Sequence, residues 1–110
     1  MRQSIIAVSL LALASLTYAN IASEILSSRT SDQQVQILGN IVNSAGEPCV
    51  PIKSFFQGLD LYGAAYWNVA CTDGRAFVIQ IANNAAATTT IIRCSAMQSL
   101  GSPCFKGFGQ

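Results

Sequence analysis

Apolar and polar residues alternate most regularly in the middle of the chain. Tyr66–Cys71 alternates along its length, and so does 77–81, with Asp73 and Gly74 between the two runs. Alternation with a period of two is typical of a strand with one buried face, and Asp-Gly between two such runs predicts a tight hairpin. Thr88–Arg93 is rich in β-branched residues and predicts a third strand. We therefore expect a three-stranded antiparallel meander.

Shorter patterns flank this meander. Val35–Val42 is apolar and β-branched and predicts another strand, which an internal glycine weakens. Pro51 suits the start of a short helix over Ile52–Leu61, and Ser95–Leu100 predicts a second short helix capped by its first residue. Together these elements predict an α+β fold: a small antiparallel β-meander with one or two short helices, in a single domain over 35–110.

The two ends of this region leave alternatives open. Residues 20–34 are polar, with a few apolar positions at helical spacing, and form either a frayed helix or a flexible arm that orders on a partner. The last segment, 104–110, carries Phe105 and Phe108 between glycines. These rings either complete the core or belong to an exposed peptide for a partner.

The start of the chain has the order of a secretory signal peptide. The short basic segment Met1–Ser4 is followed by the uncharged apolar run Ile5–Leu16, and then by Thr17 and Ala19 as the small residues of a cleavage site. The apolar run is shorter than the about 20 residues that cross a membrane. We expect residues 1–19 to be removed on export, with an uncleaved N-terminal anchor as the alternative.

The chain has four cysteines, Cys49, Cys71, Cys94 and Cys104. An even number of cysteines in a small exported chain predicts two disulfides. The short helix expected between Cys94 and Cys104 favours a bridge across it, which leaves Cys49 to pair with Cys71, while the other two pairings remain open. Neither a Cys-x-x-Cys pair nor a histidine is present, so we expect no metal site and no thioredoxin-like redox centre.

Charge is scarce along the chain. Hydrophobic residues make up 51% of it and charged residues 10%, against about 25% in a typical soluble domain. The net charge is +1, and removal of Arg2 with the signal peptide leaves five basic and five acidic side chains. The sequence has no basic patch of the kind that binds nucleic acid. A surface with few charges and no net charge favours association with other proteins.

Catalytic chemistry is not indicated. Without histidine, neither a Ser-His-Asp nor a Cys-His arrangement can form. The carboxylates are expected to be solvated or to lie in turns, and no phosphate-binding glycine loop or calcium cluster is present. We expect no enzyme activity, no metal and no cofactor. The carboxylates are Glu24, Asp32, Glu47, Asp60 and Asp73.

Two tyrosines are the candidate partner-binding residues. Tyr62 and Tyr66 are expected on the face opposite Trp67, with small residues between them, where they would form a flat exposed patch. Ordinary half-buried tyrosines are the alternative. The candidate surface also includes the N-terminal arm and the tip of the predicted hairpin, Asp73-Gly74-Arg75.

The stretch Tyr66–Ile81, with Cys94 and the later Pro103-Cys104-Phe105, carries an aromatic-x-Val-x-Cys-x-(Asp/Asn)-Gly-x-x-aromatic hairpin and a late Cys-Phe. It resembles uncharacterised small exported proteins of proteobacteria, which implies a periplasmic two-layer domain. The segment Cys71–Gly74 is also similar to the Cys-x-(Asp/Asn)-Gly hairpin of the C-type lysozyme inhibitors, which close a β-barrel with more strands. In its size and neutral composition the chain resembles accessory subunits of type IV secretion core complexes.

These observations favour a non-catalytic periplasmic module that binds other envelope proteins. Its expected place is an accessory or structural subunit of a cell-envelope assembly, such as a secretion system, at the periplasmic face of the outer membrane or in the periplasm. The alternative is a secreted inhibitor or binder of a cell-wall hydrolase, which would act as a purified monomer.

Overall fold

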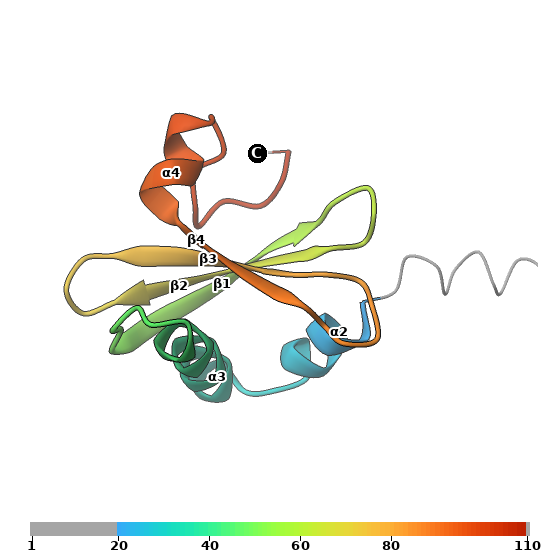
Figure 1. Ribbon diagram of the computed structural model, residues 1–110, viewed down its shortest axis with the longest axis horizontal. Coiled ribbons are helices and arrows are strands. Elements are labelled where there is room, and N and C mark those ends of the chain that lie inside the picture. The colour runs from blue at the N-terminus through green and yellow to red at the C-terminus, as the bar shows by residue number, and fades with distance from the viewer. Residues whose placement is uncertain (1–19, 110) are drawn as a thin grey trace, which may run out of the picture.

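The computed structural model describes residues 20–109, so the expected signal peptide lies outside the described residues. A four-stranded sheet crosses the domain, with two helices on one face and the third helix and the C-terminal segment on the other (Figure 1). The predicted α+β class is confirmed. In chain order the elements are α2 (Ile21–Ser27), α3 (Ser31–Ser44), β1 (Pro51–Leu59), β2 (Ala65–Cys71), β3 (Ala76–Ile81), β4 (Thr89–Arg93) and α4 (Cys94–Ser99).

The sheet is an antiparallel meander in the order β1-β2-β3-β4. Its last three strands are those of the predicted meander, and the predicted hairpin joins β2 to β3. There the N–H of Gly74 donates to the carbonyl of Cys71 over 3.2 Å, and the N–H of Cys71 donates to the carbonyl of Arg75 over 2.8 Å. Gly74 has a φ of 90°, a conformation that glycine adopts without steric cost.

The prediction of a strand over Val35–Val42 is wrong, because this segment lies in helix α3. Leu38 and Val42, one helical turn apart, are both fully buried against the sheet. The helix begins with a capping box, in which Thr30 and Gln33 each accept a hydrogen bond from the other's backbone N–H. Burial of one helical face and this cap outweigh the β preference of the branched residues.

The prediction of a helix over Ile52–Leu61 is also wrong, because Pro51–Leu59 forms the edge strand β1. The register of β1 against β2 shifts twice, between Pro51 and Lys53 and between Phe56 and Gly58. A bulge adds a residue to one strand and interrupts its alternation. The segment therefore has no clear period of two by which a strand could be recognised.

Residues 20–34 contain α2 and the start of α3, joined by a short turn, and do not form a flexible arm. Asn20 caps α2 and is 2% exposed. Its Nδ2 donates to the carbonyls of Gly63 and Ile81, both over 3.0 Å, so the start of α2 is bonded to the β1–β2 loop and to the end of β3. At the other end of the chain, the predicted helix over 95–100 is present as α4, but its N-cap is Arg93 and not Ser95.

The hydrophobic core lies between the sheet and the two N-terminal helices. From α3, Gly39 lies so close to Pro51 of β1 that an added Cβ would be 2.3 Å from the ring. A glycine there permits the helix to approach the edge of the sheet. The buried members of the core include Leu26, Leu38, Val42, Trp67, Val69, Phe77 and Ile79.

Both disulfides join the pairs that the sequence favours. Cys49 is bonded to Cys71, and Cys94 is bonded to Cys104. The first bridge is buried at the hairpin end of the sheet and connects the segment after α3 to the end of β2. The second encloses α4 and holds the C-terminal segment near the end of β4.

The C-terminal segment folds back onto the second face of the sheet. Buried Gln57 donates from Nε2 to the carbonyls of Pro103 and Lys106, both over 3.1 Å. The ring of Phe105 is half-buried, with its centroid 6.2 Å from that of Phe55. The segment packs against the sheet, but its rings do not complete the core, because Phe105 is half-buried and Phe108 is 44% exposed.

Candidate interaction surface

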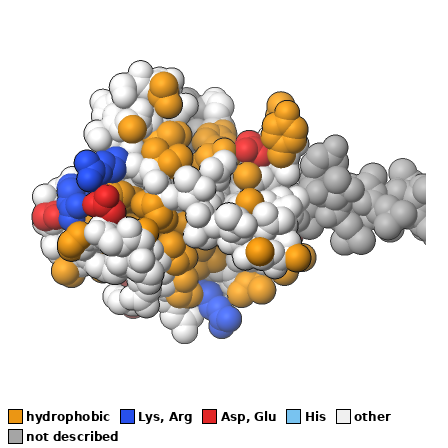
Figure 2. All heavy atoms as spheres, viewed as in Figure 1, with side chains coloured by type: hydrophobic (Ala, Val, Ile, Leu, Met, Phe, Trp, Pro, Cys, Tyr) orange, Lys and Arg blue, Asp and Glu red, His pale blue; other side chains and the backbone are white. Residues whose placement is uncertain are grey.

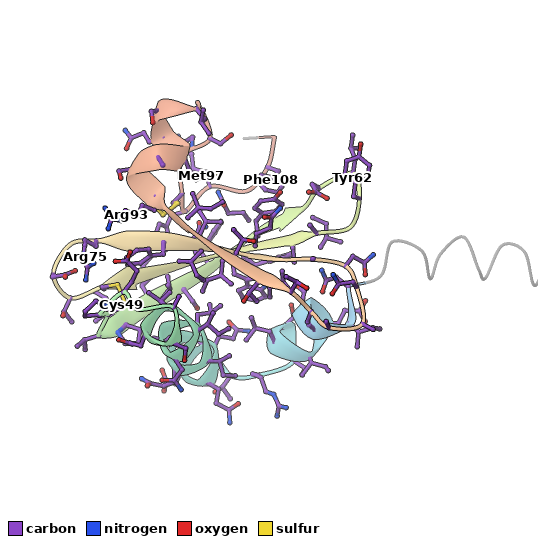
Figure 3. The ribbon with its side chains drawn as sticks, in the orientation of Figure 1. Cys49, Tyr62, Arg75, Arg93, Met97 and Phe108 are labelled. Atoms are coloured by element: carbon purple, nitrogen blue, oxygen red, sulfur yellow. A yellow bond between two sulfur atoms is a disulfide. The ribbon has the colours of Figure 1, made fainter. Side chains whose placement is uncertain are left out.

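The loop between β1 and β2 presents two large apolar side chains to solvent. Leu61 is 86% exposed and Tyr62 is 85% exposed. We call residues 60–64 the Tyr62 loop. It projects from one end of the sheet, and Tyr62 points away from the body of the domain (Figure 3). Exposed aromatic and aliphatic side chains that cluster on a projecting element are typical of protein-binding sites.

The backbone of the Tyr62 loop is held by Asp60. The Oδ1 atom of Asp60 accepts hydrogen bonds from the N–H groups of Tyr62, over 2.9 Å, and Ala64, over 3.0 Å. The backbone N–H of Asp60 donates to the carbonyl of Ala64, and the N–H of Gly63 donates back to the carbonyl of Asp60. The side chain of Asn20, at the start of α2, donates a hydrogen bond to the carbonyl of Gly63. The exposed pair is therefore carried on an internally bonded turn.

Tyr66 lies on the face of the sheet opposite Trp67, as predicted, but it is half-buried. Its ring packs edge-on against Phe108, with centroids 5.2 Å apart. Its hydroxyl donates to Oδ2 of Asp60 over 3.0 Å and accepts from Nε2 of Gln80 over 2.8 Å. The expected flat patch of Tyr62 and Tyr66 is therefore wrong: residues 63–65 between them are buried, and Tyr66 supports the loop from inside.

Both members of the Asp60–Tyr66 pair have shifted pKa values. Partial burial disfavours the charged form of Asp60, but the hydrogen bonds from Tyr62, Tyr66 and Ala64 outweigh it and lower the pKa of this carboxyl below its usual range. Burial, and then the hydrogen bond and negative charge of Asp60, raise the pKa of Tyr66. At neutral pH the pair is a carboxylate accepting from a neutral phenol.

The lowered pKa of Asp60 predicts a stability that depends on pH. The ionised carboxylate stabilises the folded state above about pH 4, and this contribution is lost as the pH falls through the lowered pKa. Replacing Asp60 by Asn is expected to lower the free energy of unfolding at pH 7 by about 1 kcal/mol and to reduce its fall in acid. Urea denaturation across the acid range measures both. Equal acid slopes in the wild type and Asp60→Asn would contradict this account.

The predicted hairpin tip lies at the other end of β2, away from the Tyr62 loop. Arg75 donates from Nε to Asp73 over 2.9 Å and from Nη1 to Glu47 over 3.2 Å, and its Nη2 bonds the carbonyl of Pro48. Hydrogen bonds from the backbone and side chain of Arg75 lower the pKa of Asp73. Arg93 also reaches Glu47, so the charged groups of this end are paired among themselves. They gather at one end of the surface in Figure 2.

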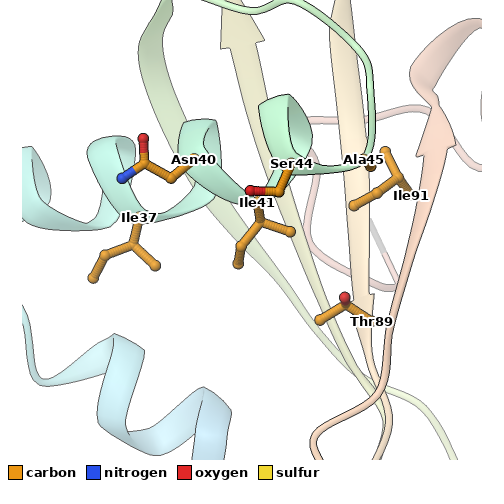
Figure 4. A pocket seen from close by; sticks show the side chains of 7 residues that line it. All are labelled: Ile37, Asn40, Ile41, Ser44, Ala45, Thr89 and Ile91. Atoms are coloured by element: carbon orange, nitrogen blue, oxygen red, sulfur yellow. The ribbon is translucent and has the colours of Figure 1, made fainter.

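The structure reveals an apolar groove that the sequence did not indicate. It lies between α3 and β4 and has a volume of about 510 Å³. Three isoleucines line it together with polar and small side chains: Ile37, Ile41, Ile91, Asn40, Ser44, Ala45 and Thr89 (Figure 4). We call it the α3–β4 groove. Hydrophobic side chains continue from it toward α2, because Ile37, Ile41 and Thr89 also line a smaller depression beside Ile25. Ile37 and Ile41 lie side by side only because residues 31–44 form a helix, and the sequence predicts a strand there.

The carboxylates do not form one cluster in the described part of the chain. Glu24 and Asp32 lie in the first turns of α2 and α3. Glu47 and Asp73 both pair with Arg75, and Asp60 lies at the other end of β2. Within residues 20–109, no group of three or more His, Cys, Asp or Glu side chains could hold a metal ion. No helix in the same range is long and apolar enough to cross a membrane.

Comparisons with protein-family models, with curated proteins and with solved structures find no match to this chain.

Proposed function

We propose that this protein is a non-catalytic module that binds another protein of the bacterial cell envelope, as an accessory or structural subunit of a multi-protein assembly. The observation that carries the proposal is the Tyr62 loop, which holds Leu61 and Tyr62 almost fully exposed on a bonded turn. A loop whose backbone is already ordered loses less entropy on association than a flexible one, and tyrosine is enriched among the residues that dominate binding energy.

The location in the envelope is part of the proposal. Two disulfides in a small domain are typical of oxidising compartments, and the signal-like order of residues 1–19 supports export. We propose the periplasm, or the periplasmic face of the outer membrane. Residues 20–109 contain five basic and five acidic side chains. This balance supports membership of a complex, since a protein with little net charge associates readily.

Replacing Leu61 and Tyr62 together by alanine tests this function. In native envelopes extracted with mild detergent and separated by size, the wild-type chain is expected in a particle several times its own mass. The double variant is expected to leave this particle and to migrate at the mass of the purified protein, because truncation removes the anchors of the contact. Its far-ultraviolet circular dichroism is expected to be unchanged, since both side chains lie outside the core.

Leu100→Ala is the matched control, because Leu100 is 79% exposed at the end of α4, away from the loop. This variant is expected to stay in the large particle. A wild-type chain that migrates alone, or a double variant that remains in the particle, would overturn the proposal.

The Tyr62 loop also supports a second candidate, a binder or inhibitor of a cell-wall hydrolase. A projecting, bonded loop with an apolar tip is a shape that can enter the cleft of an enzyme. The two candidates differ in what the purified protein does. An inhibitor would reduce cell-wall hydrolysis by itself and would lose this effect in the Leu61/Tyr62 double variant, whereas an assembly subunit would have no effect on the hydrolase.

A further inference from the structure

The outer edge of β4 is open for pairing. The hydrogen bond from Ala82 N–H to the Thr88 carbonyl, 2.8 Å, fixes the alternation of the β3–β4 ladder. By this alternation Thr90 bonds toward β3, while the N–H and C=O groups of Thr89 and Ile91 point out of the sheet. In the part of the chain that the structure describes, no other segment bonds to these outward groups.

The opposite edge of the sheet is protected. β1 begins with Pro51, carries Lys53, and has two register shifts, and Gly58 has a φ of 142°. The backbone of Phe108 also bonds the carbonyl of Gln57 from the C-terminal segment. Prolines, lysines and bulges are the features that keep edge strands from pairing with other chains. β4 has a continuous register with β3 and carries none of them.

An apolar surface accompanies the open edge. The side chains of Thr89 and Ile91 line the α3–β4 groove together with Ile37 and Ile41 (Figure 4). A strand added beside β4 would therefore place every second side chain on the groove side of the sheet. Strand addition of this kind combines backbone hydrogen bonds with pockets for alternate side chains. The edge and the groove therefore form one binding surface for an extended segment.

We propose that β4 pairs antiparallel with β4 of a second copy of this chain, around a two-fold axis at Ile91. Ile91 is the central residue of β4 and has outward N–H and C=O groups, as a symmetric pair requires. In this register Arg93 lies opposite Thr89, so no like charges face each other. The absence of net charge in residues 20–109 removes long-range repulsion between copies.

This interface is separate from the Tyr62 loop, because β4 is one edge strand of the sheet and the loop joins β1 and β2 at the opposite edge. The dimer and the proposed function can therefore fail independently. A monomeric purified protein that still migrates in a large envelope particle would overturn the dimer alone. A dimeric protein that is found in no larger particle would overturn the function alone.

Charge substitutions at Ile91 test the pairing. The purified, oxidised wild-type protein is expected to be a dimer at micromolar concentrations by sedimentation equilibrium. Ile91→Lys and Ile91→Glu are each expected to raise the dissociation constant at least about tenfold, because two side chains of like charge, with Cβ atoms about 5 Å apart, would lie directly opposite each other. An equimolar mixture of the two variants is expected to recover the dimer, since the charges are then opposite.

The control is Ile52→Lys, because Ile52 is 61% exposed on the protected edge strand. This variant is expected to dimerise like the wild type. A wild-type monomer, an Ile91→Lys variant that dimerises normally, or a variant mixture that stays monomeric would overturn the proposal. Amide exchange in the wild type gives an independent measurement: exchange at Ile91 is expected to slow as the protein concentration rises, and no change with concentration would also overturn it.

Discussion

Replacing Asn68 by alanine is expected to lower the free energy of unfolding by about 2–4 kcal/mol. Asn68 is fully buried on β2 and connects the sheet to the C-terminal segment. Its Nδ2 donates to Oε1 of Gln57 over 2.9 Å, and its Oδ1 accepts from the N–H of Phe105 over 2.6 Å. Alanine would leave buried Oε1 of Gln57 and the half-buried N–H of Phe105 without these bonds, and it would open a cavity beneath the segment.

Chemical denaturation measures this loss, and Asn40→Ala is the matched control. Asn40 is exposed on α3, so its truncation is expected to change the free energy of unfolding by less than about 0.5 kcal/mol. The Asn68→Ala variant is also expected to expose the C-terminal segment to protease first, because this side chain anchors it directly. Stability within experimental error of the wild type would show that the buried amide pair does not hold the segment.

Removing the Cys49–Cys71 disulfide by replacing both cysteines with alanine is expected to cost about 3–4 kcal/mol. The bridge closes a loop with a sequence separation of 22, against 10 for Cys94–Cys104. Longer loops lose more entropy on closure in the unfolded chain. Both sulfurs also belong to buried residues, so their loss removes packing from the core as well.

The pair Cys94→Ala and Cys104→Ala serves as the comparison. It is expected to cost about 2–3 kcal/mol, since its loop is shorter and its residues are only half-buried. The midpoint of guanidinium denaturation is therefore expected to fall further for the Cys49/Cys71 variant than for the Cys94/Cys104 variant. The reverse order would contradict the account of what each bridge contributes.

Local sequence patterns are sufficient to predict the β2–β3 hairpin and the Cys94–Cys104 disulfide. The Asp73-Gly74 turn and the alternation on either side of it act over a few residues and gave the hairpin correctly. The disulfide between Cys94 and Cys104 was favoured for the same reason, because the chain between them is short. In both cases the structure depends on neighbouring residues and little on the rest of the chain.

The first half of the fold depended on contacts that the sequence does not state. Val35–Val42 has β-branched residues, which favour a strand. The helical signals are the capping box at Thr30 and Gln33, just before this segment, and the four-residue spacing of Leu38 and Val42 within it. In β1 the bulges removed the alternation, so pairing with β2 is what determines the strand.

The candidate site shows the same limit. Tyr62 and Tyr66 are the same residue type four positions apart, and nothing local distinguishes the exposed one from the supporting one. Phe108, which is distant in sequence, covers Tyr66, while Asp60 turns the backbone so that Tyr62 projects. The importance of Leu61 and the existence of the α3–β4 groove could only be recognised once the strands and α3 were in place.

The central claim is that the Tyr62 loop contacts a partner protein in the envelope. The most direct measurement is photo-crosslinking in intact cells, with a photoreactive phenylalanine analogue in place of Tyr62 and, as the control, in place of Leu100. The account predicts one discrete adduct of higher mass from position 62, lost when Leu61 is also replaced by alanine, and no such adduct from position 100. No adduct at position 62, or the same adduct from both positions, would contradict it.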